Sequence, residues 1–417
     1  MKAEGSKGTG NEGAFGLHRW VNDPLTACSL FIAVGLIVLV GVRWSSYQWD
    51  FHMFVGAARD FSEGRSPYRG EGLSFFHPPV TLYIYWLFTL MPTALACTVW
   101  YMLKLGALAR LLTIWHRDYV PLSVHFTTGF FLILAYDGAI YADLVSGNVS
   151  IFEELVLWYG FANLLRRRYF VFGLCVVLAA QVKLTPIFFA GLFLVVGDRP
   201  KWGAFFATLA GFAALFSLNQ WLEPELFQRF WAASALLDER GSQNASLLAL
   251  IRDVSDRILG VEATASSRLD ELIYVAGSLI ILAISWLFLA RYRRNTPAPD
   301  PRLLIALSCF VFALVSPRFK VYTCILLLAP TWYMIRSIKW SKSVPLATVL
   351  LLVLVLLPQG HSLLPFRQAF LLFGEYITLV ATAAMWVTCL LVLSQLAGKP
   401  LVKAQVYWDP PENRRTA

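Results

Sequence analysis

A few ionisable side chains stand where a strongly apolar chain would not place them without a reason. Asp50 follows the first long apolar run, within the aromatic stretch Trp49-Asp50-Phe51-His52, and Lys183 interrupts a later apolar run. A charge inside a membrane costs at least about 2.5–3.5 kcal/mol, so each of these residues calls for a partner or a function. A carboxylate at the membrane surface suits general-base chemistry, and it also suits a solvated interfacial loop.

Three cations suggest an anionic ligand. Lys183 lies in Gln181-Val182-Lys183-Leu184-Thr185-Pro186, where its ammonium would contact a phosphate, pair with a carboxylate such as Glu153, or extend to the membrane surface. Arg318 and Lys320 join two apolar runs on the side of the membrane where topology does not favour cations. They would either bind an anionic headgroup or anchor the loop in the interface.

Other polar residues have simpler interpretations. His77 precedes Pro78-Pro79 at the start of an apolar run, and proline is common in the first turn of a helix. Asp60 is expected to pair with Arg59 or Arg65. The sequence contains no GxxxxGK[ST] loop, no HExxH and no CxxC, which argues against an ATP-driven pump or a metalloprotease. Any activated substrate should therefore arrive through the membrane plane, most simply as a lipid.

The elements that position these residues must be membrane helices. Of the 417 residues, 58% are hydrophobic and 15% are charged, whereas a soluble domain has about 45–50% and about 25%. We therefore predict an all-α, polytopic integral membrane helix bundle with roughly 10–13 spans. The six cysteines all lie in apolar runs, which disfavours disulfides and thiolate metal sites.

The net charge of +9 indicates orientation and does not indicate nucleic-acid binding. Most of the 35 Lys and Arg residues lie in short loops between apolar runs, and such loops mark the cytoplasmic side. We predict a cytoplasmic tail over 1–23, a transmembrane domain over 24–397 and a second cytoplasmic tail over 398–417. The run 24–42 is expected to remain as the first span, without a cleaved signal peptide.

Two long segments, 43–77 and 219–271, are predicted to be extracytoplasmic loops that carry interfacial helices. Strict alternation fails in the front half, because His116–Asp118 and Arg166–Arg168 cannot both be cytoplasmic if every apolar run crosses the membrane. One run must be short, broken or re-entrant. The best candidate is 169–196, where Gln181, Lys183 and Pro186 interrupt the apolar pattern.

Short motifs follow one another in a recognisable order. The first group comprises Asp50-Phe51, Ala57-Ala58, Gly64-Arg65-Ser66-Pro67-Tyr68 and Phe76-His77-Pro78-Pro79. The later ones are Ser146-Gly147-Asn148-Val149-Ser150, Val182-Lys183-Leu184-Thr185-Pro186, Gln243-Asn244-Ala245-Ser246 and Ser316-Pro317. With these motifs, between Asp50 and Tyr322, the chain resembles glycosyltransferase family 87 of the GT-C superfamily, the polyprenol-phosphate-dependent mannosyl- and arabinosyltransferases of bacteria.

The resemblance implies a GT-C type fold and a glycosyltransferase of the bacterial inner membrane. One sugar, mannose by default, would pass from a polyprenyl-phosphate-linked donor to a hydroxyl of a glycolipid or glycan on the extracytoplasmic face, with inversion. Asp50 would be the general base. Lys183, Arg318 and Lys320 are the candidates for the donor phosphate, and four residues would line the donor and acceptor site: His77, Asn148, Asn244 and Tyr68. No cofactor or metal is implied.

Departures from the family pattern leave the sugar and the acceptor open. Asn148 stands where glutamine is usual, His77 stands where an aromatic residue is common, and the stretch after Ser316-Pro317 lacks a histidine. Two alternatives remain: a flippase or transporter of lipid-linked sugars, and a GT-C enzyme that modifies lipid A or protein. A transporter would spread paired charges through its spans and often shows repeat symmetry, whereas the polar residues here concentrate at one face.

Overall fold

The computed structural model describes residues 48–68, 75–120, 126–235, 240–241, 244–259, 268–297, 299–337, 345–357 and 374–397. All regular structure in these residues is helical, as predicted, and none of them forms a strand. The expected tails 1–23 and 398–417, and the expected first span 24–42, lie outside the described residues.

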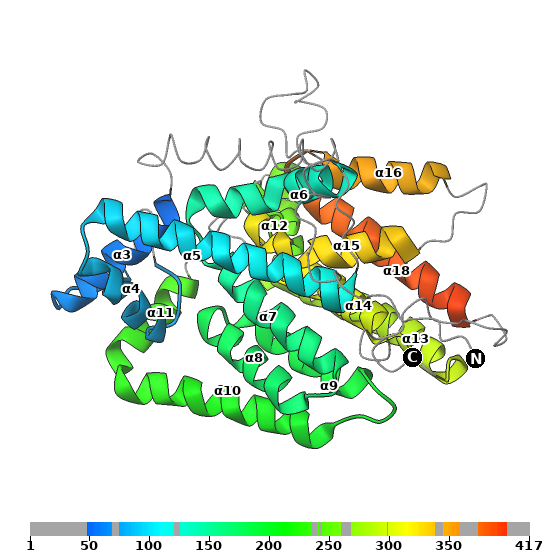
Figure 1. Cartoon of the computed structure of the whole chain (residues 1–417), viewed down its shortest axis with the longest axis horizontal. Helices are drawn as coiled ribbons and strands as arrows, with labels where there is room; N and C mark the ends of the chain where they lie inside the picture. The colour runs from blue at the N-terminus through cyan, green and yellow to red at the C-terminus, as the bar shows by residue number, and fades with distance from the viewer. Residues whose placement is uncertain are drawn as a thin grey trace, which may run out of the picture.

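The helices of the first half form a continuous series (Figure 1). They are α3 (Trp49–Ser62), α4 (Val80–Thr89), α5 (Thr93–Ile114), η2 (Trp115–Tyr119), α6 (Phe126–Ser146), α7 (Ser150–Leu165), α8 (Tyr169–Val182), η3 (Thr185–Gly191) and α9 (Leu192–Val195). The second half contributes α10 (Trp202–Leu222), α11 (Pro224–Ala235), α12 (Leu247–Leu259), α13 (Arg268–Asn295), α14 (Pro301–Val315), η6 (Val321–Cys324), α15 (Ile325–Ser337), α16 (Pro345–Leu356) and α18 (Ile377–Ala397).

Five helical segments among the described residues have the length and apolar composition that a membrane crossing needs. They are Thr93–Tyr119, Thr128–Ser146, Trp202–Leu222, Arg268–Asn295 and Ile377–Ala397. Shorter apolar helices, including α8 and α14, pack among them. The chain is therefore an all-α membrane helix bundle, as the composition indicated, and the total number of spans stays a prediction.

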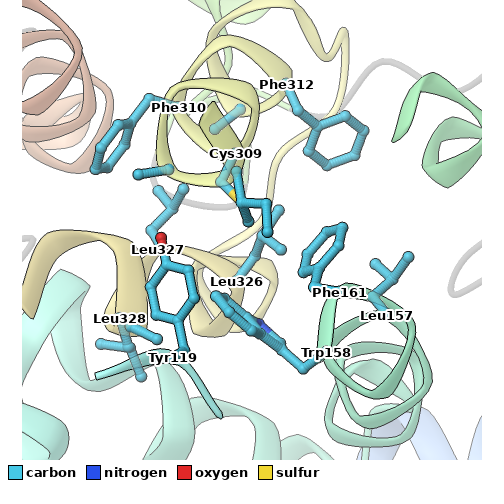
Figure 2. Packing of buried hydrophobic residues seen from close by; sticks show 14 of the residues in the cluster. Tyr119, Leu157, Trp158, Phe161, Cys309, Phe310, Phe312, Leu326, Leu327 and Leu328 are labelled. Atoms are coloured by element: carbon cyan, nitrogen blue, oxygen red, sulfur yellow. The ribbon is translucent and has the colours of Figure 1, made fainter. Parts of the chain in front are cut away.

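The core of the bundle is packed by aromatic and branched side chains. Figure 2 shows Trp158 of α7 beside Tyr119, with Cys309 of α14 and Leu326 of α15 close by. The rings of Tyr119 and Trp158 lie 4.8 Å apart at an interplanar angle of 74°, the edge-to-face geometry that aromatic pairs favour. Between helices in lipid such close packing, more than the hydrophobic effect, holds the bundle together.

Basic turns gather at one end of the bundle. Asp118 in η2 forms an ion pair with Arg166 after α7, and Arg293 donates hydrogen bonds to the carbonyls of Leu194 (3.0 Å) and Gly197 (3.1 Å). Figure 1 shows α9 and the end of α13 at the right of the bundle, with α3, α4 and α11 at the left. The turns at 115–119, 166–168 and 194–197 therefore share one end, which we call the basic end.

Two structural features bear on the alternation problem in the front half. The run 169–196 breaks where the sequence predicted: α8 ends at Val182, Lys183 is extended, and Pro186 cannot continue an α-helix. The chain then turns back, since the rings of Phe172 and Phe193 lie 4.9 Å apart. The second feature is α4, which the sequence did not distinguish from a span. It has only 10 residues, or about 15 Å, and packs on α3.

Candidate active site

Asp50 lies in the first turn of α3, which is held in place by its aromatic face. Phe51 and Phe54 are buried, and the ring of Phe51 stacks on Trp100 at 4.9 Å. This anchoring keeps Asp50 only 7% exposed. Burial raises the pKa of Asp50, and the Asn148 hydrogen bond, the next largest effect, acts in the opposite direction. The carboxyl is thus a stronger base than a solvated aspartate.

The turn between α6 and α7 approaches α3 closely because it contains Gly147. Gly147 has a φ of +72°, and a Cβ at this position would lie 2.9 Å from the Cβ of Phe51. The Trp100 indole donates to the Gly147 carbonyl at 2.9 Å. This approach lets the Asn148 side chain donate a hydrogen bond from Nδ2 to Oδ2 of Asp50, at 2.7 Å.

Lys104 supports the same turn and was missed by the sequence analysis. Its Nζ lies 2.7 Å from Oδ2 of Asp143, and both side chains are fully buried. It also donates to the carbonyl of Asn148 at 2.8 Å. A single lysine within the apolar run that forms α5 was the signal that could have identified it, because an unpaired ammonium there would be costly.

Lys183 stands at the tip of the α8–η3 hairpin and faces the start of α7. Its Nζ lies 2.5 Å from Oε2 of Glu153 and donates to Oγ of Ser150 at 2.8 Å. It also lies 5.7 Å from the ring centre of Tyr322. The pairing with Glu153 was one of the alternatives that the sequence left open, and it brings Lys183 to the turn that holds Asn148.

Arg318 and Lys320 lie in the loop between α14 and η6. Nζ of Lys320 lies 5.9 Å from the ring centre of Tyr322, the same ring that Lys183 contacts. The guanidinium carbon of Arg318 lies 5.3 Å from the ring centre of Phe76. Both cations lower the pKa of Asp50, against the larger effect of burial, so their fields extend to that carboxyl. Three cations from distant parts of the sequence thus surround one region.

Asn244 and Ser246 hold that cationic loop in place. Oδ1 of Asn244 accepts a hydrogen bond from the backbone N–H of Phe319 at 2.8 Å, and its amide donates to the carbonyl of Pro317 at 3.4 Å. The Ser246 hydroxyl donates to the same carbonyl at 2.7 Å. The second large loop therefore contributes to the site through its contact with residues 317–319.

His77 and Tyr68 lie on the other side of the site. The Tyr68 hydroxyl donates to the carbonyl of His77 at 2.8 Å, and Nδ1 of His77 lies 2.9 Å from the carbonyl of Val182. Because a carbonyl only accepts, Nδ1 carries the proton and Nε2 is left as an acceptor. Burial lowers the pKa of His77 to about 3, with smaller contributions from Lys183, Arg318 and Lys320. The imidazole is therefore neutral.

All eight residues predicted from the sequence to form a site thus lie near one another, at the end of the bundle opposite the basic end. Asp60 is separate from them and pairs with Arg65 at 2.7 Å, as expected. Within the described residues, no group of three or more His, Cys, Asp or Glu side chains is placed to hold a metal ion.

The fold and site together define a class: a membrane helix bundle with a buried carboxylate and several cations at one end. The profile of glycosyltransferase family 87 matches residues 75–317, more than half of the chain. The chain belongs to glycosyltransferase family 87. No curated protein matches it. His77, Asn148, Lys183 and Asn244 lie inside the matched segment, whereas Asp50, Tyr68, Arg318 and Lys320 lie outside it.

Proposed function

We propose that this membrane glycosyltransferase moves one sugar from a polyprenyl-phosphate donor to a hydroxyl of a glycolipid or glycan. Mannose is the default sugar because of the family resemblance. The acceptor oxygen attacks the anomeric carbon, its proton passes to Asp50, and the bond between that carbon and the phosphate oxygen breaks. A single displacement of this kind inverts the configuration and releases polyprenyl phosphate.

One observation carries this proposal: a buried carboxylate lies within electrostatic reach of several cations from other elements. Lys320, Lys104 and Arg318 act on Asp50 through their charges. Lys183, which pairs with Glu153, is connected to Asp50 through hydrogen bonds of Ser150 and Asn148. Cations beside the base would suit a phosphodiester, which carries one negative charge. When Asp50 takes up a proton, the freed charge stabilises the second negative charge of the leaving phosphate.

The remaining residues would orient the substrates. The free Nε2 of His77 suits a hydrogen bond from a sugar hydroxyl. Asn148 would hold Asp50, and Tyr68 would hold the backbone at His77. Asn244 would act on the donor through the loop that carries Arg318 and Lys320. Since a lipid phosphate is already a competent leaving group and cations stand beside it, the reaction needs no metal.

The distribution of basic turns supports an extracytoplasmic site in a bacterial inner membrane. The basic end carries Arg117, Arg166, Arg167 and Arg168, which the positive-inside rule places in the cytoplasm. Asp50 lies at the opposite end, so it would face the outer side. We also propose that the tails 1–23 and 398–417 are cytoplasmic, that 24–397 is the transmembrane domain, and that 43–77 and 219–271 are outer loops.

The experiment that tests this proposal is a transfer assay in proteoliposomes that contain purified protein. Radiolabelled polyprenyl-phosphate sugars are supplied with fractions of a bacterial lipid extract, and labelled products are separated from the donor. We expect covalent transfer to a lipid or glycan acceptor. Movement of the intact donor across the bilayer without transfer would indicate the flippase alternative, and transfer to lipid A or protein alone would indicate the other. Movement without transfer, or transfer to protein alone, would overturn the proposal, whereas transfer to lipid A would specify which glycolipid is the acceptor.

A further inference from the structure

A continuous series of hydrogen bonds joins Lys183 to Asp50. Nζ of Lys183 donates to Oγ of Ser150 at 2.8 Å, and this hydroxyl donates to Oδ1 of Asn148 at 3.0 Å. Nδ2 of Asn148 donates to Oδ2 of Asp50 at 2.7 Å. The four side chains come from the junction after α8, from α7, from the turn before α7 and from α3, and Ser150 is fully buried.

The direction of this series is determined at one end. An ammonium only donates hydrogen bonds, so Ser150 must accept from Lys183 and send its own hydrogen to Asn148. The Asn148 amide then presents its oxygen to Ser150 and its nitrogen to Asp50. The backbone N–H of Ser150 also donates to Oδ1 of Asn148, at 3.2 Å, so both donors of Ser150 keep the amide oxygen away from the carboxylate. The hydroxyl makes the shorter of these two bonds, and it alone connects the amide to the charge of Lys183.

We propose that Ser150 is a positioning residue, which orients the Asn148 amide so that Asp50 is held ionised and ready to accept the proton of the acceptor hydroxyl. This inference rests on the proposed function, since it assigns a task to the base of the same site. It also links that base to Lys183, whose remaining N–H is left for the donor phosphate.

Other charged and titratable groups act on Asp50 from the elements around it. They are Lys104 of α5, Asp143 of α6, Tyr85 of α4, and Arg318 and Lys320 of the α14–η6 loop. None of these side chains is altered by a change at Ser150. The effect of Ser150 on the ionisation of Asp50 should therefore be separable from theirs.

The test compares Ser150→Ala with Ser146→Ala as a matched control. Ser146 is also a buried serine of this turn, but its hydroxyl donates to the Asp143 carbonyl and accepts from the backbone N–H of Asn148. We expect the acidic limb of the kcat/KM profile to move to higher pH by up to about one unit in Ser150→Ala. The Asn148 amide oxygen then keeps only the bond from the Ser150 backbone N–H and loses its connection to Lys183. The limb should not move in Ser146→Ala.

Two further variants keep the test informative if Ser150→Ala does not fold. Ser150→Cys retains the shape but is a weaker donor, so its limb should also move to higher pH. Ser150→Thr retains the hydroxyl and should keep the wild-type limb. Superimposable profiles for Ser150→Ala, Ser150→Cys and wild type would overturn the proposal, as would an equal displacement in Ser146→Ala.

A spectroscopic measurement separates this inference from the proposed function. Infrared difference spectra of the parent and an Asp50→Asn variant isolate the carboxyl band of Asp50, whose titration needs no substrate. A titration displaced to higher pH in Ser150→Ala supports the positioning role even if no polyprenyl-phosphate sugar is ever transferred. An unchanged titration overturns it even if transfer by the wild-type protein is established.

Discussion

At the scale of single residues, burial and hydrogen bonding act on Asp50 in opposite directions. Burial is the larger effect and raises the pKa of Asp50 above the ordinary 3.8, while Asn148, Lys320 and Lys104 favour the ionised form. A general base must be ionised, so kcat/KM should fall as the pH falls through this raised pKa. His77, whose pKa is lowered to about 3, stays neutral and should add no limb near the usual 6.5.

We therefore expect a pH profile with one acidic limb, lying above the range of a solvated aspartate. The measurement is kcat/KM for the donor across the acidic and neutral range, with the stability of the protein checked at each pH. A histidine-like limb that disappears in His77→Gln would contradict the assignment, because it would show that the imidazole titrates.

The residues of this site could be predicted individually, but their contacts could not. Asp50 and Lys183 were identified because charges in an apolar chain need an explanation. The hydrogen bond between Asp50 and Asn148 joins residues 98 positions apart, and no local pattern predicts it. Ser150 was missed because a serine at the start of a helix is common. Lys104 was missed because nothing near it in the sequence indicates its partner.

At the scale of elements, the site depends on how closely α3 approaches the α6–α7 turn. Gly147 has a φ of +72°, and a Cβ at this position would lie only 2.9 Å from the Cβ of Phe51 and 3.0 Å from the Cβ of Gln48. Both features exclude a larger residue without movement of α3, which carries Asp50. The turn is thus the element whose geometry determines the distance between Asn148 and the base.

Gly147→Ala should therefore destabilise the protein by about 1–3 kcal/mol and reduce transfer. Gly106→Ala is the matched control: Gly106 lies in α5, and a Cβ there would meet no atom within 4 Å. That change should be neutral or slightly stabilising, since alanine is the better helix former. Thermal unfolding in detergent checks both. Equal unfolding temperatures for the two variants would show that the turn tolerates a side chain.

Some elements follow from the sequence and others do not. The break after α8 was predictable because Pro186 and two polar residues interrupt the apolar run. The short α4 was not singled out, since its apolar composition equals that of a span and only its packing on α3 distinguishes it. The interruption in α6, where Ala135–Gly138 leave helical geometry, has no sequence signal beyond Gly138.

At the scale of the whole molecule, two groups of charged residues lie at opposite ends of the bundle. Basic turns lie at one end, and the carboxylate with its surrounding cations lies at the other. Loop composition predicted that basic loops and site residues lie on opposite sides. That Asp118 and Arg166 lie at the same end is seen only in the structure. The arrangement makes a direct prediction about sidedness.

In intact cells, a membrane-impermeant thiol reagent should label Ser62→Cys and should label Arg167→Cys only after permeabilisation. Both positions are exposed, one at the end of α3 and one at the basic end, and the five described cysteines are buried. The parent protein, which retains Cys28, is the control, because any labelling that it shows comes from its native cysteines. Labelling of Arg167→Cys alone in intact cells would reverse the orientation.

We propose above that Asp50 removes the proton from the acceptor hydroxyl, and the rate of transfer by an Asp50→Asn variant tests this role directly. We expect a loss of about 10²–10⁴-fold in kcat, with donor binding and folding retained. Asp60→Asn is the control, because Asp60 lies on the same helix but pairs with Arg65 away from the site. Wild-type rates of transfer in Asp50→Asn, measured with donor bound, would contradict the account.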